Sequence, residues 1–204
     1  MTVLFAQIDT FVLTGIAVVV VVLLFRIISV YNRLTILRNR YKNAYSQIDA
    51  QLKRRYDLIP NLVETVKGYM GHERATLEAV INARNVAVVA NRMAWANPGD
   101  ANVMRSLGSA ETELSGTLLR LFALSETYPD LKANQTTMNL QKELTSTENK
   151  IVFARRAFND SVRYYNTARQ IFPNVLCANM LGFTEARLFE IESPKELEVP
   201  RVWF

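Results

Sequence analysis

The feature that most constrains this chain is an apolar run near its N-terminus. Residues 10–25 read TFVLTGIAVVVVVLLF without a charge, and the apolar character continues to Val30 with Arg26 as its one charge. A helix needs about 20 such residues to cross a bilayer, and an arginine near its end can reach the headgroups. The run predicts a membrane anchor within residues 1–30. A buried core helix is the disfavoured alternative, because nothing later in the chain could cover so apolar a stretch.

The charges on either side of the run predict its orientation. Asp9 precedes the run, and no basic residue does. Five basic residues follow within a short distance, namely Arg26, Arg33, Arg38, Arg40 and Lys42. Because basic flanks stay on the cytoplasmic side, we expect a single-pass protein with its N-terminus outside and its C-terminal bulk in the cytoplasm.

After residue 30, apolar residues recur at helical spacing. Over residues 31–70 the rhythm stays in phase on both sides of Pro60, which predicts one helix that is bent at the proline and continuous with the anchor. Turn residues such as Pro98 and Pro129 separate the later segments. These are expected as helices at about 73–96, 101–126 and 135–170, a short helix at 175–181 and an irregular tail at 184–204.

Two of the predicted helices carry a heptad pattern. Leucines at 107, 114 and 121 are spaced by seven, and so are Leu144, Ile151, Phe158 and Tyr165. Long first and fourth helices joined to two shorter ones by short loops are typical of a bundle. We therefore predict an all-α fold in which residues 31–183 form an antiparallel up-down bundle of four long helices and a short C-terminal helix.

Residue types that carry catalysis or bind metals are sparse. His72 and Cys177 are the single residues of their kinds, so a zinc cluster is not expected. Nothing around Cys177 resembles a nucleophile elbow, so a catalytic Cys-His arrangement is not expected either. Cys177 lies in an apolar stretch, which predicts a buried thiol. Glu111 and Glu113 lie two apart and point to different sides of a helix. We expect no enzyme activity, no cofactor and no metal, and a hydrolase with an unfamiliar site ranks last.

Four stretches carry a recognisable pattern. They are RRYDLIPNLVETVKGY at 54–69 with His72-Glu73 after it, YPDLKANQ at 128–135, ENKIVFARRAFNDSVRYYN at 148–166 and FPNVLCANMLGF at 172–183. Together with the anchor, and in this order, they resemble the LemA family of bacterial membrane proteins. The resemblance covers essentially the whole chain. It implies a cytoplasmic helical bundle on a single anchor in the bacterial cytoplasmic (inner) membrane, and it brings no established reaction.

Charged residues crowd Pro60, and this cluster has two interpretations. In the first, it is the solvated face of a bent helix, with local pairs such as Asp57 with Arg54. In the second, the proline frees a carbonyl near Tyr56 and the bend is where a partner docks. The candidate docking bend consists of Arg54, Arg55, Asp57, Pro60, Asn61 and Glu64.

Positive charge is concentrated on the helix next to the anchor. Residues 31–75 carry nine basic and four acidic side chains, whereas residues 76–204 carry fourteen of each. A basic residue close to an anionic leaflet contributes about 1 kcal/mol, so we expect the membrane-proximal ones to contact membrane lipid. No groove-reading motif is present, so nucleic acid is not an expected partner.

The second predicted helix has more apolar side chains than one inward stripe can hold. That stripe is predicted to contain Leu77, Ile81, Val88 and Trp95. Val86, Val89 and Met93 are left over, and so broad an apolar surface usually packs against a partner. We expect a non-enzymatic, membrane-anchored scaffold that forms a homo-oligomer and docks an unidentified membrane protein. The alternative is an accessory or regulatory subunit of a membrane enzyme such as a protease.

Overall fold

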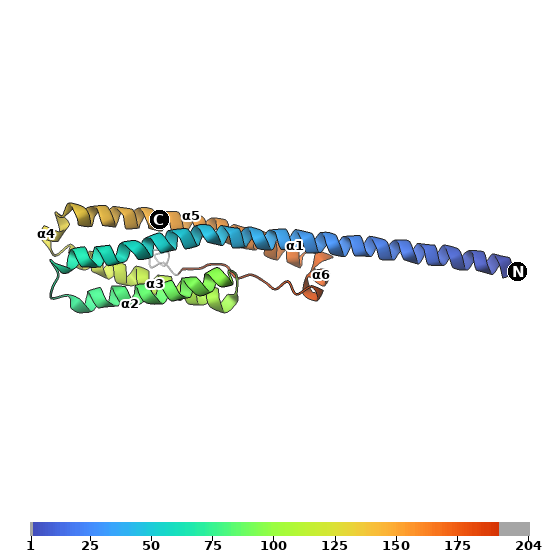
Figure 1. Ribbon diagram of the computed structural model, residues 1–204, viewed down its shortest axis with the longest axis horizontal. Helices are drawn as coiled ribbons and strands as arrows, with labels where there is room; N and C mark the ends of the chain where they lie inside the picture. The colour runs from blue at the N-terminus through green and yellow to red at the C-terminus, as the bar shows by residue number, and fades with distance from the viewer. Residues whose placement is uncertain (1, 192–204) are drawn as a thin grey trace, which may run out of the picture. The chain divides into compact units, whose positions relative to one another are not determined.

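All regular structure in the described part of the chain is helical. The computed structural model describes residues 2–191, with side chains for 13–131 and 133–191 (Figure 1). The helices are α1 (Thr2–Lys67), α2 (Arg74–Ala96), α3 (Ala101–Ser125), α4 (Pro129–Lys132), α5 (Gln135–Gln170) and α6 (Asn174–Met180). The all-α prediction is therefore confirmed. The expected irregularity of 192–204 lies outside the described residues.

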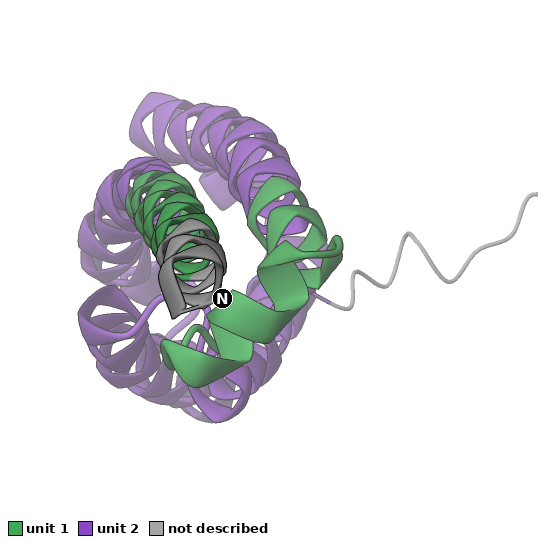
Figure 2. Cartoon of the chain, turned by 90° about the vertical axis from the view of Figure 1, so that its right-hand side faces the viewer, with its two compact units in different colours: residues 1–39, 164–185 green, residues 40–163, 186–204 purple. Residues whose placement is uncertain are grey.

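The chain forms two compact units, which Figure 2 distinguishes by colour. The anchor unit consists of residues 1–39 and 164–185, and the bundle unit consists of residues 40–163 and 186–204. Helices α1 and α5 each contribute to both units. In the bundle unit, α1, α2, α3 and α5 alternate in direction, and the short α4 lies in the connection between α3 and α5.

Helix α1 passes through Pro60 without ending and continues to Lys67. This confirms the prediction of one helix that joins the anchor to the bundle. Tyr69 continues the helical spacing of Ile59, Leu62 and Val66, which predicts it on the same inward face. This prediction is wrong: the tyrosine is exposed, and Met70 is fully buried instead. The reason is that α1 ends two residues before Tyr69, so the helical spacing no longer decides which side chain points inward.

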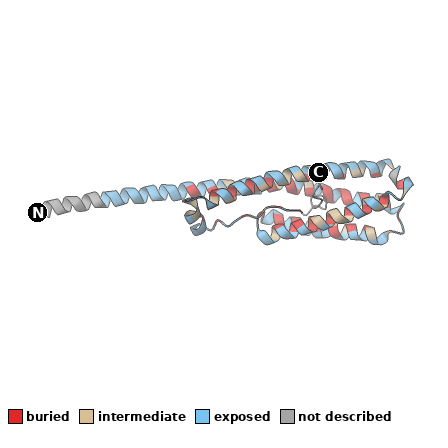
Figure 3. Cartoon of the chain, turned by 180° about the vertical axis from the view of Figure 1, so that it is seen from behind, coloured by how far each residue is buried: buried red, intermediate tan, exposed pale blue. Residues whose placement is uncertain are grey.

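The heptad pattern of α5 marks the core of the bundle unit. Leu144, Ile151 and Phe158 are buried along one stripe (Figure 3). The ring of Phe158 packs edge-on against Tyr41 and Tyr45 of α1, with centroids 6.2 and 5.7 Å apart. Such aromatic pairs contribute about 0.5–1.5 kcal/mol beyond the area that they bury. The sequence prediction for this helix is confirmed.

The inward face of α2 differs from the predicted stripe. Trp95 is half exposed, and Ile81 and Val88 are only partly buried. The buried positions are mostly small, namely Leu77, Val80, Ala83, Ala87, Ala90, Asn91 and Ala94. Alanines let neighbouring backbones approach closely, and α2 packs directly against α3. Leu77 is buried as predicted, but selecting core positions by side-chain size missed the alanine face that forms most of the core side of α2.

Asp100 fixes the start of α3. Its carboxylate accepts hydrogen bonds from the backbone N–H groups of Asn102 and Val103, each at 3.0 Å. A cap of this kind stabilises a helix by about 1 kcal/mol. Gly99, just before it, has φ +98°, a conformation that few residues other than glycine adopt. The sharp turn between α2 and α3 follows from these two neighbours.

Residues 186–191, which we call the strap, lack helical structure as predicted but are not a loose tail. Ala186 and Phe189 are buried. The side-chain amide of Asn159 on α5 donates to the carbonyl of Phe189 at 3.1 Å and accepts from its N–H at 2.8 Å. The N–H of Arg187 donates to the carbonyl of Gly99 at 2.8 Å. The strap thus forms part of the bundle core.

The anchor unit contains the apolar part of α1. Residues 13–29 are all exposed, and Val30 is the first residue of the described side chains to be buried. Among the described residues, α1 is the one helix long and apolar enough to cross a membrane. Phe183 packs edge-on against Tyr31, with ring centroids 5.6 Å apart, and the guanidinium of Arg38 lies 5.1 Å from the Phe183 ring centroid.

Candidate functional site

The residues around Pro60 are divided between two faces of α1. Asp57, Pro60, Asn61 and Glu64 follow the spacing of one helical face, and all four are exposed. Arg55 points the other way and is buried, with 3% of its surface accessible. The candidate docking bend is therefore an outer stripe, and Arg55 belongs to the core behind it. Its role in docking stays a prediction.

The carbonyl released by Pro60 already has a partner. Proline has no backbone N–H, so the carbonyl of Tyr56, four residues earlier, lacks its helical donor. Nε of Arg84 on α2 donates to this carbonyl at 2.8 Å. Arg54 forms an ion pair of 2.7 Å with Glu143 on α5 and not the expected local pair. Arg54 and the Tyr56 carbonyl thus connect α1 to α5 and to α2. A docking partner at Pro60 would contact side chains and not a free carbonyl.

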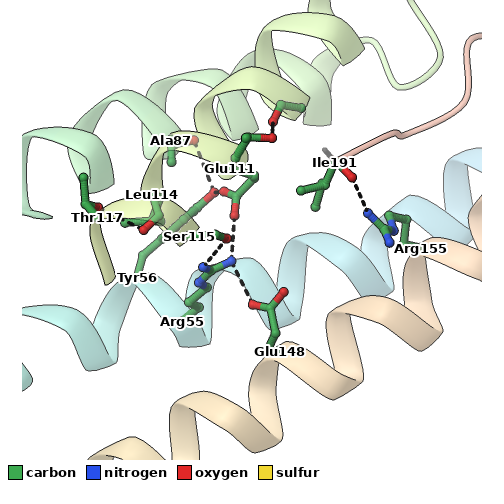
Figure 4. A network of polar contacts seen from close by, with 12 residues as sticks. Arg55, Tyr56, Ala87, Glu111, Leu114, Ser115, Thr117, Glu148, Arg155 and Ile191 are labelled. Atoms are coloured by element: carbon green, nitrogen blue, oxygen red, sulfur yellow. Dashed lines mark hydrogen bonds and ion pairs between the residues drawn. The ribbon is translucent and has the colours of Figure 1, made fainter. Parts of the chain in front are cut away.

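Arg55 is the centre of a polar network that is buried at Arg55 and Glu111 and partly exposed at Glu148 (Figure 4). Its Nη1 lies 3.1 Å from Oε2 of Glu111 on α3 and 3.0 Å from Oε2 of Glu148 on α5. Its Nη2 donates to Oγ of Ser115 at 2.8 Å. Removing one member of a buried ion pair typically costs about 3–5 kcal/mol, because the other charge remains without compensation. The network therefore holds α1, α3 and α5 in one register.

Tyr56 completes this network from the next position on α1. Its hydroxyl donates to Oε1 of Glu111 and lies 3.3 Å from the carbonyl of Ala87 on α2. Burial and the nearby Glu111 charge raise the pKa of the Tyr56 hydroxyl, so it stays protonated and keeps donating. Burial also raises the pKa of Glu111, while Arg55 and the Tyr56 hydrogen bond oppose that rise.

A second network connects α1 to α2. The Tyr45 hydroxyl donates to Oδ1 of Asn91 at 2.7 Å, and Nδ2 of Asn91 donates to Oδ1 of Asp49 at 2.8 Å. Nζ of Lys53 pairs with Oδ2 of Asp49 at 2.7 Å and lies 5.5 Å from the Trp95 ring centroid. Burial raises the pKa of the Tyr45 hydroxyl, with Asp49 adding to the rise. The ammonium group of Lys53 thus lies over the Trp95 ring at the edge of the core.

The signal for Glu111 was present in the sequence. Glu111 lies four residues after Leu107 and three before Leu114, which places it on the leucine face of α3. The spacing between Glu111 and Glu113 alone does not reveal that Glu111 lies on the leucine face. The prediction that the two glutamates point to different sides of the helix is correct, since Glu111 is buried and Glu113 is exposed. A charged residue in phase with a leucine heptad indicates a buried partner of opposite charge, which here is Arg55.

The other candidate residues lie apart from these networks. His72 is exposed in the turn between α1 and α2. Cys177 was expected to be buried, but it is partly exposed because α6 is covered on one face only. Within the described residues, no group of three or more His, Cys, Asp or Glu side chains is placed to hold a metal ion.

The outer face of α2 carries the leftover apolar residues. Val86, Val89 and Met93 are 54%, 52% and 56% exposed. At 100° per residue their side chains fall within an arc of about 60°. Prediction and structure agree that these three side chains lie outside the core, although only Leu77 of the predicted inward stripe is buried. This apolar surface and the exposed stripe at Pro60 are the two candidate interaction sites of the bundle unit.

Comparison with known proteins gives the family. Residues 44–204 match the LemA family. The chain belongs to this family. A similar protein is the magnetosome protein MamQ of Magnetospirillum gryphiswaldense, which is 23% identical over 174 residues, 78% of this chain and 64% of MamQ. The chain thus spans less than two thirds of that relative's length. Neither the family description nor the relative's name states a reaction.

The family and the exposed apolar helix together identify a membrane-associated helical protein. The family match begins at residue 44, so it covers most of the bundle unit and leaves the apolar part of α1 outside. Evidence for the anchor therefore comes from the chain itself, through the exposure of residues 13–29.

Proposed function

We propose that this LemA-family protein is a non-enzymatic scaffold of the bacterial inner membrane that assembles with copies of itself through the outer face of α2. The observation that carries the proposal is an apolar stripe on that face, which contains no charged residue and runs beside the exposed Arg74, Glu78 and Arg92. The stripe consists of Ala75, Ala79, Asn82, Val86, Val89 and Met93, all of them exposed. A surface helix normally presents charged side chains to water, so this stripe indicates a protein contact.

The free energy gained by burying the exposed α2 side chains is of the size expected for association between membrane-anchored chains. Fully burying a Val or Met side chain contributes about 1.5–3 kcal/mol, so covering the exposed half of Val86, Val89 and Met93 contributes about 3 kcal/mol per chain. A symmetric pair would gain about twice that, against an association cost of about 4–15 kcal/mol in free solution. Confinement of both chains by their anchors raises their effective concentration and lowers this cost. Self-association is therefore expected in the membrane and weak in dilute solution.

Replacement of Val86, Val89 and Met93 by glutamate tests the proposal. The full chain is compared in nanodiscs or vesicles by cross-linking and by particle mass, at fixed protein-to-lipid ratio. The triple variant should lose the oligomer while keeping its helix content by circular dichroism, because all three side chains point away from the core.

The matched control replaces Leu119, Met138 and Phe153 by glutamate, since these exposed apolar residues lie on α3 and α5. It should leave the oligomer intact. A wild-type chain that is monomeric at membrane-like density would contradict assembly, and the accessory-subunit function would replace it. Equal loss in both triple variants would show a general effect of charge and not an α2 interface.

The exposed stripe of Asp57, Pro60, Asn61 and Glu64 is our second candidate contact, for a membrane protein partner. It lies on α1 and is separate from the α2 face, so a self-assembled scaffold would keep it accessible. The cluster of basic residues just after the apolar run supports an orientation with the bundle in the cytoplasm.

A further inference from the structure

A second apolar surface lies in the anchor unit, around α6. Residues 170–184 contain no charged side chain. The segment is bounded by Arg169 and Glu185, whose side chains form an ion pair of 3.6 Å (Nη2 to Oε2). The ion pair brings the two ends of the segment together, so residues 170–184 form a closed, uncharged loop with α6 inside it.

Most of the large apolar side chains of this loop point outward, and Phe183 is the exception. Phe172 is 76% and Met180 is 85% exposed. Ile171, Leu176 and Leu181 are also exposed, whereas the buried members are Ala178 and Phe183. Soluble proteins seldom gather so many exposed apolar side chains within a dozen residues, and such patches mark contacts with a membrane or another protein.

The loop lies where the apolar run of α1 ends. Protein cover on α1 begins at Val30, after the fully exposed residues 13–29. The cover at this level includes Phe183, whose ring packs on Tyr31 and under Arg38. The end of the loop is therefore fixed to α1 within about two turns of the last residue of the apolar run, which is the depth of the bilayer surface if residues 10–30 span it.

We propose that residues 170–184 are a second membrane contact, which rests in the lipid interface beside the anchor helix. Three observations favour lipid over a protein partner: continuity with the apolar run, the absence of charge in the loop, and the exposed Arg33 and partly exposed Arg38 of the same unit, which suit anionic headgroups. Helices that rest in this interface bury their apolar face about 5–10 Å deep. The loop would stop the anchor unit from tilting freely.

Spin labels on the full chain in vesicles test this contact. In a Cys177→Ser background, single cysteines replace Phe172 or Met180, and a label at Phe153 on α5, 68% exposed, is the matched control. Vesicles contain phosphatidylethanolamine and phosphatidylglycerol at low protein density. Accessibility is measured to oxygen, which concentrates in lipid, and to a water-soluble nickel chelate. The ratio of oxygen to nickel accessibility should be several-fold higher at 172 and 180 than at 153.

Two outcomes would overturn the proposal. Ratios at 172 and 180 equal to that at 153 would place the loop in water. Low accessibility to both reagents would show that protein covers it. Circular dichroism checks that each variant keeps its helix content, and a label at Leu176 replaces any variant that does not. The self-association of α2 can fail or hold independently, because it is tested by different substitutions, at Val86, Val89 and Met93.

Discussion

The contact between α3 and the strap allows a sharp test with one pair of substitutions. A Cβ atom built on Gly108 of α3 would overlap the carbonyl oxygen of Glu190. A Cβ atom built on Gly116 of the same helix has nothing within 4 Å. Glycine to alanine in a helix normally stabilises by about 0.5–1 kcal/mol. We therefore expect opposite signs: Gly116→Ala should stabilise the protein, and Gly108→Ala should destabilise it.

The magnitude follows from what the strap loses when it moves. The neighbouring Phe189 is held by two hydrogen bonds with Asn159, each contributing about 0.5–1.5 kcal/mol. Its ring is fully buried, and complete burial contributes about 1.5–3 kcal/mol. A partly displaced strap would lose part of the hydrogen-bond free energy and part of the burial free energy. The higher helix propensity of alanine would offset part of this loss. The expected net loss for Gly108→Ala is about 2–4 kcal/mol.

Urea unfolding of the full chain in detergent, followed by circular dichroism and tryptophan fluorescence, gives both free energies. Hydrogen exchange provides an independent readout, since the Phe189 N–H should lose protection in Gly108→Ala and keep it in Gly116→Ala. If Gly108→Ala stabilises the protein as much as Gly116→Ala, the close approach of the strap to α3 is wrong.

Two further predictions concern the buried carboxylate and the orientation. Burial raises the pKa of Glu111 above its usual 4.5, so the stability of the wild type relative to Glu111→Gln should be greatest below pH 4.5 and decline as the pH rises through the folded-state pKa. Urea unfolding at several pH values measures this difference in stability. An increase of the difference with pH would mean that pairing with Arg55 dominates. A reporter that works only in the cytoplasm should be active when fused after Phe204, whereas one that requires export should be inactive; the reverse pattern would contradict the orientation.

The sequence predicted the elements that follow from regular repetition. The heptad of α5 gave the correct core positions, because large side chains at regular spacing have one way to be buried along a straight helix. The phase across Pro60 correctly gave one helix. Proline on the outer face of α1 is tolerated because Arg84 satisfies the carbonyl that the ring leaves without a donor, and that partner comes from another helix.

The sequence did not predict features that depend on contacts between distant segments. The alanine face of α2 is buried because a neighbouring helix packs closely against it. An alanine in the sequence does not indicate whether such a neighbour is present. The strap has no repeat, and its burial depends on Asn159 and on the missing side chain of Gly108. The buried pair of Arg55 and Glu111 was recognisable in part, since both residues lie in phase with apolar neighbours. The sequence gives no sign that the two would meet.

The burial of Phe189 has a consequence for the order of events during synthesis. The apolar run of α1 leaves the ribosome first, whereas the bundle core is complete only after the chain has been made beyond Phe189. Domains generally fold once their parts have emerged, and contacts between distant segments form slowly. Membrane insertion should therefore come before completion of the core. The inward side chains of α1, such as Tyr45 and Ile48, should then stay unpacked until the later helices have been translated.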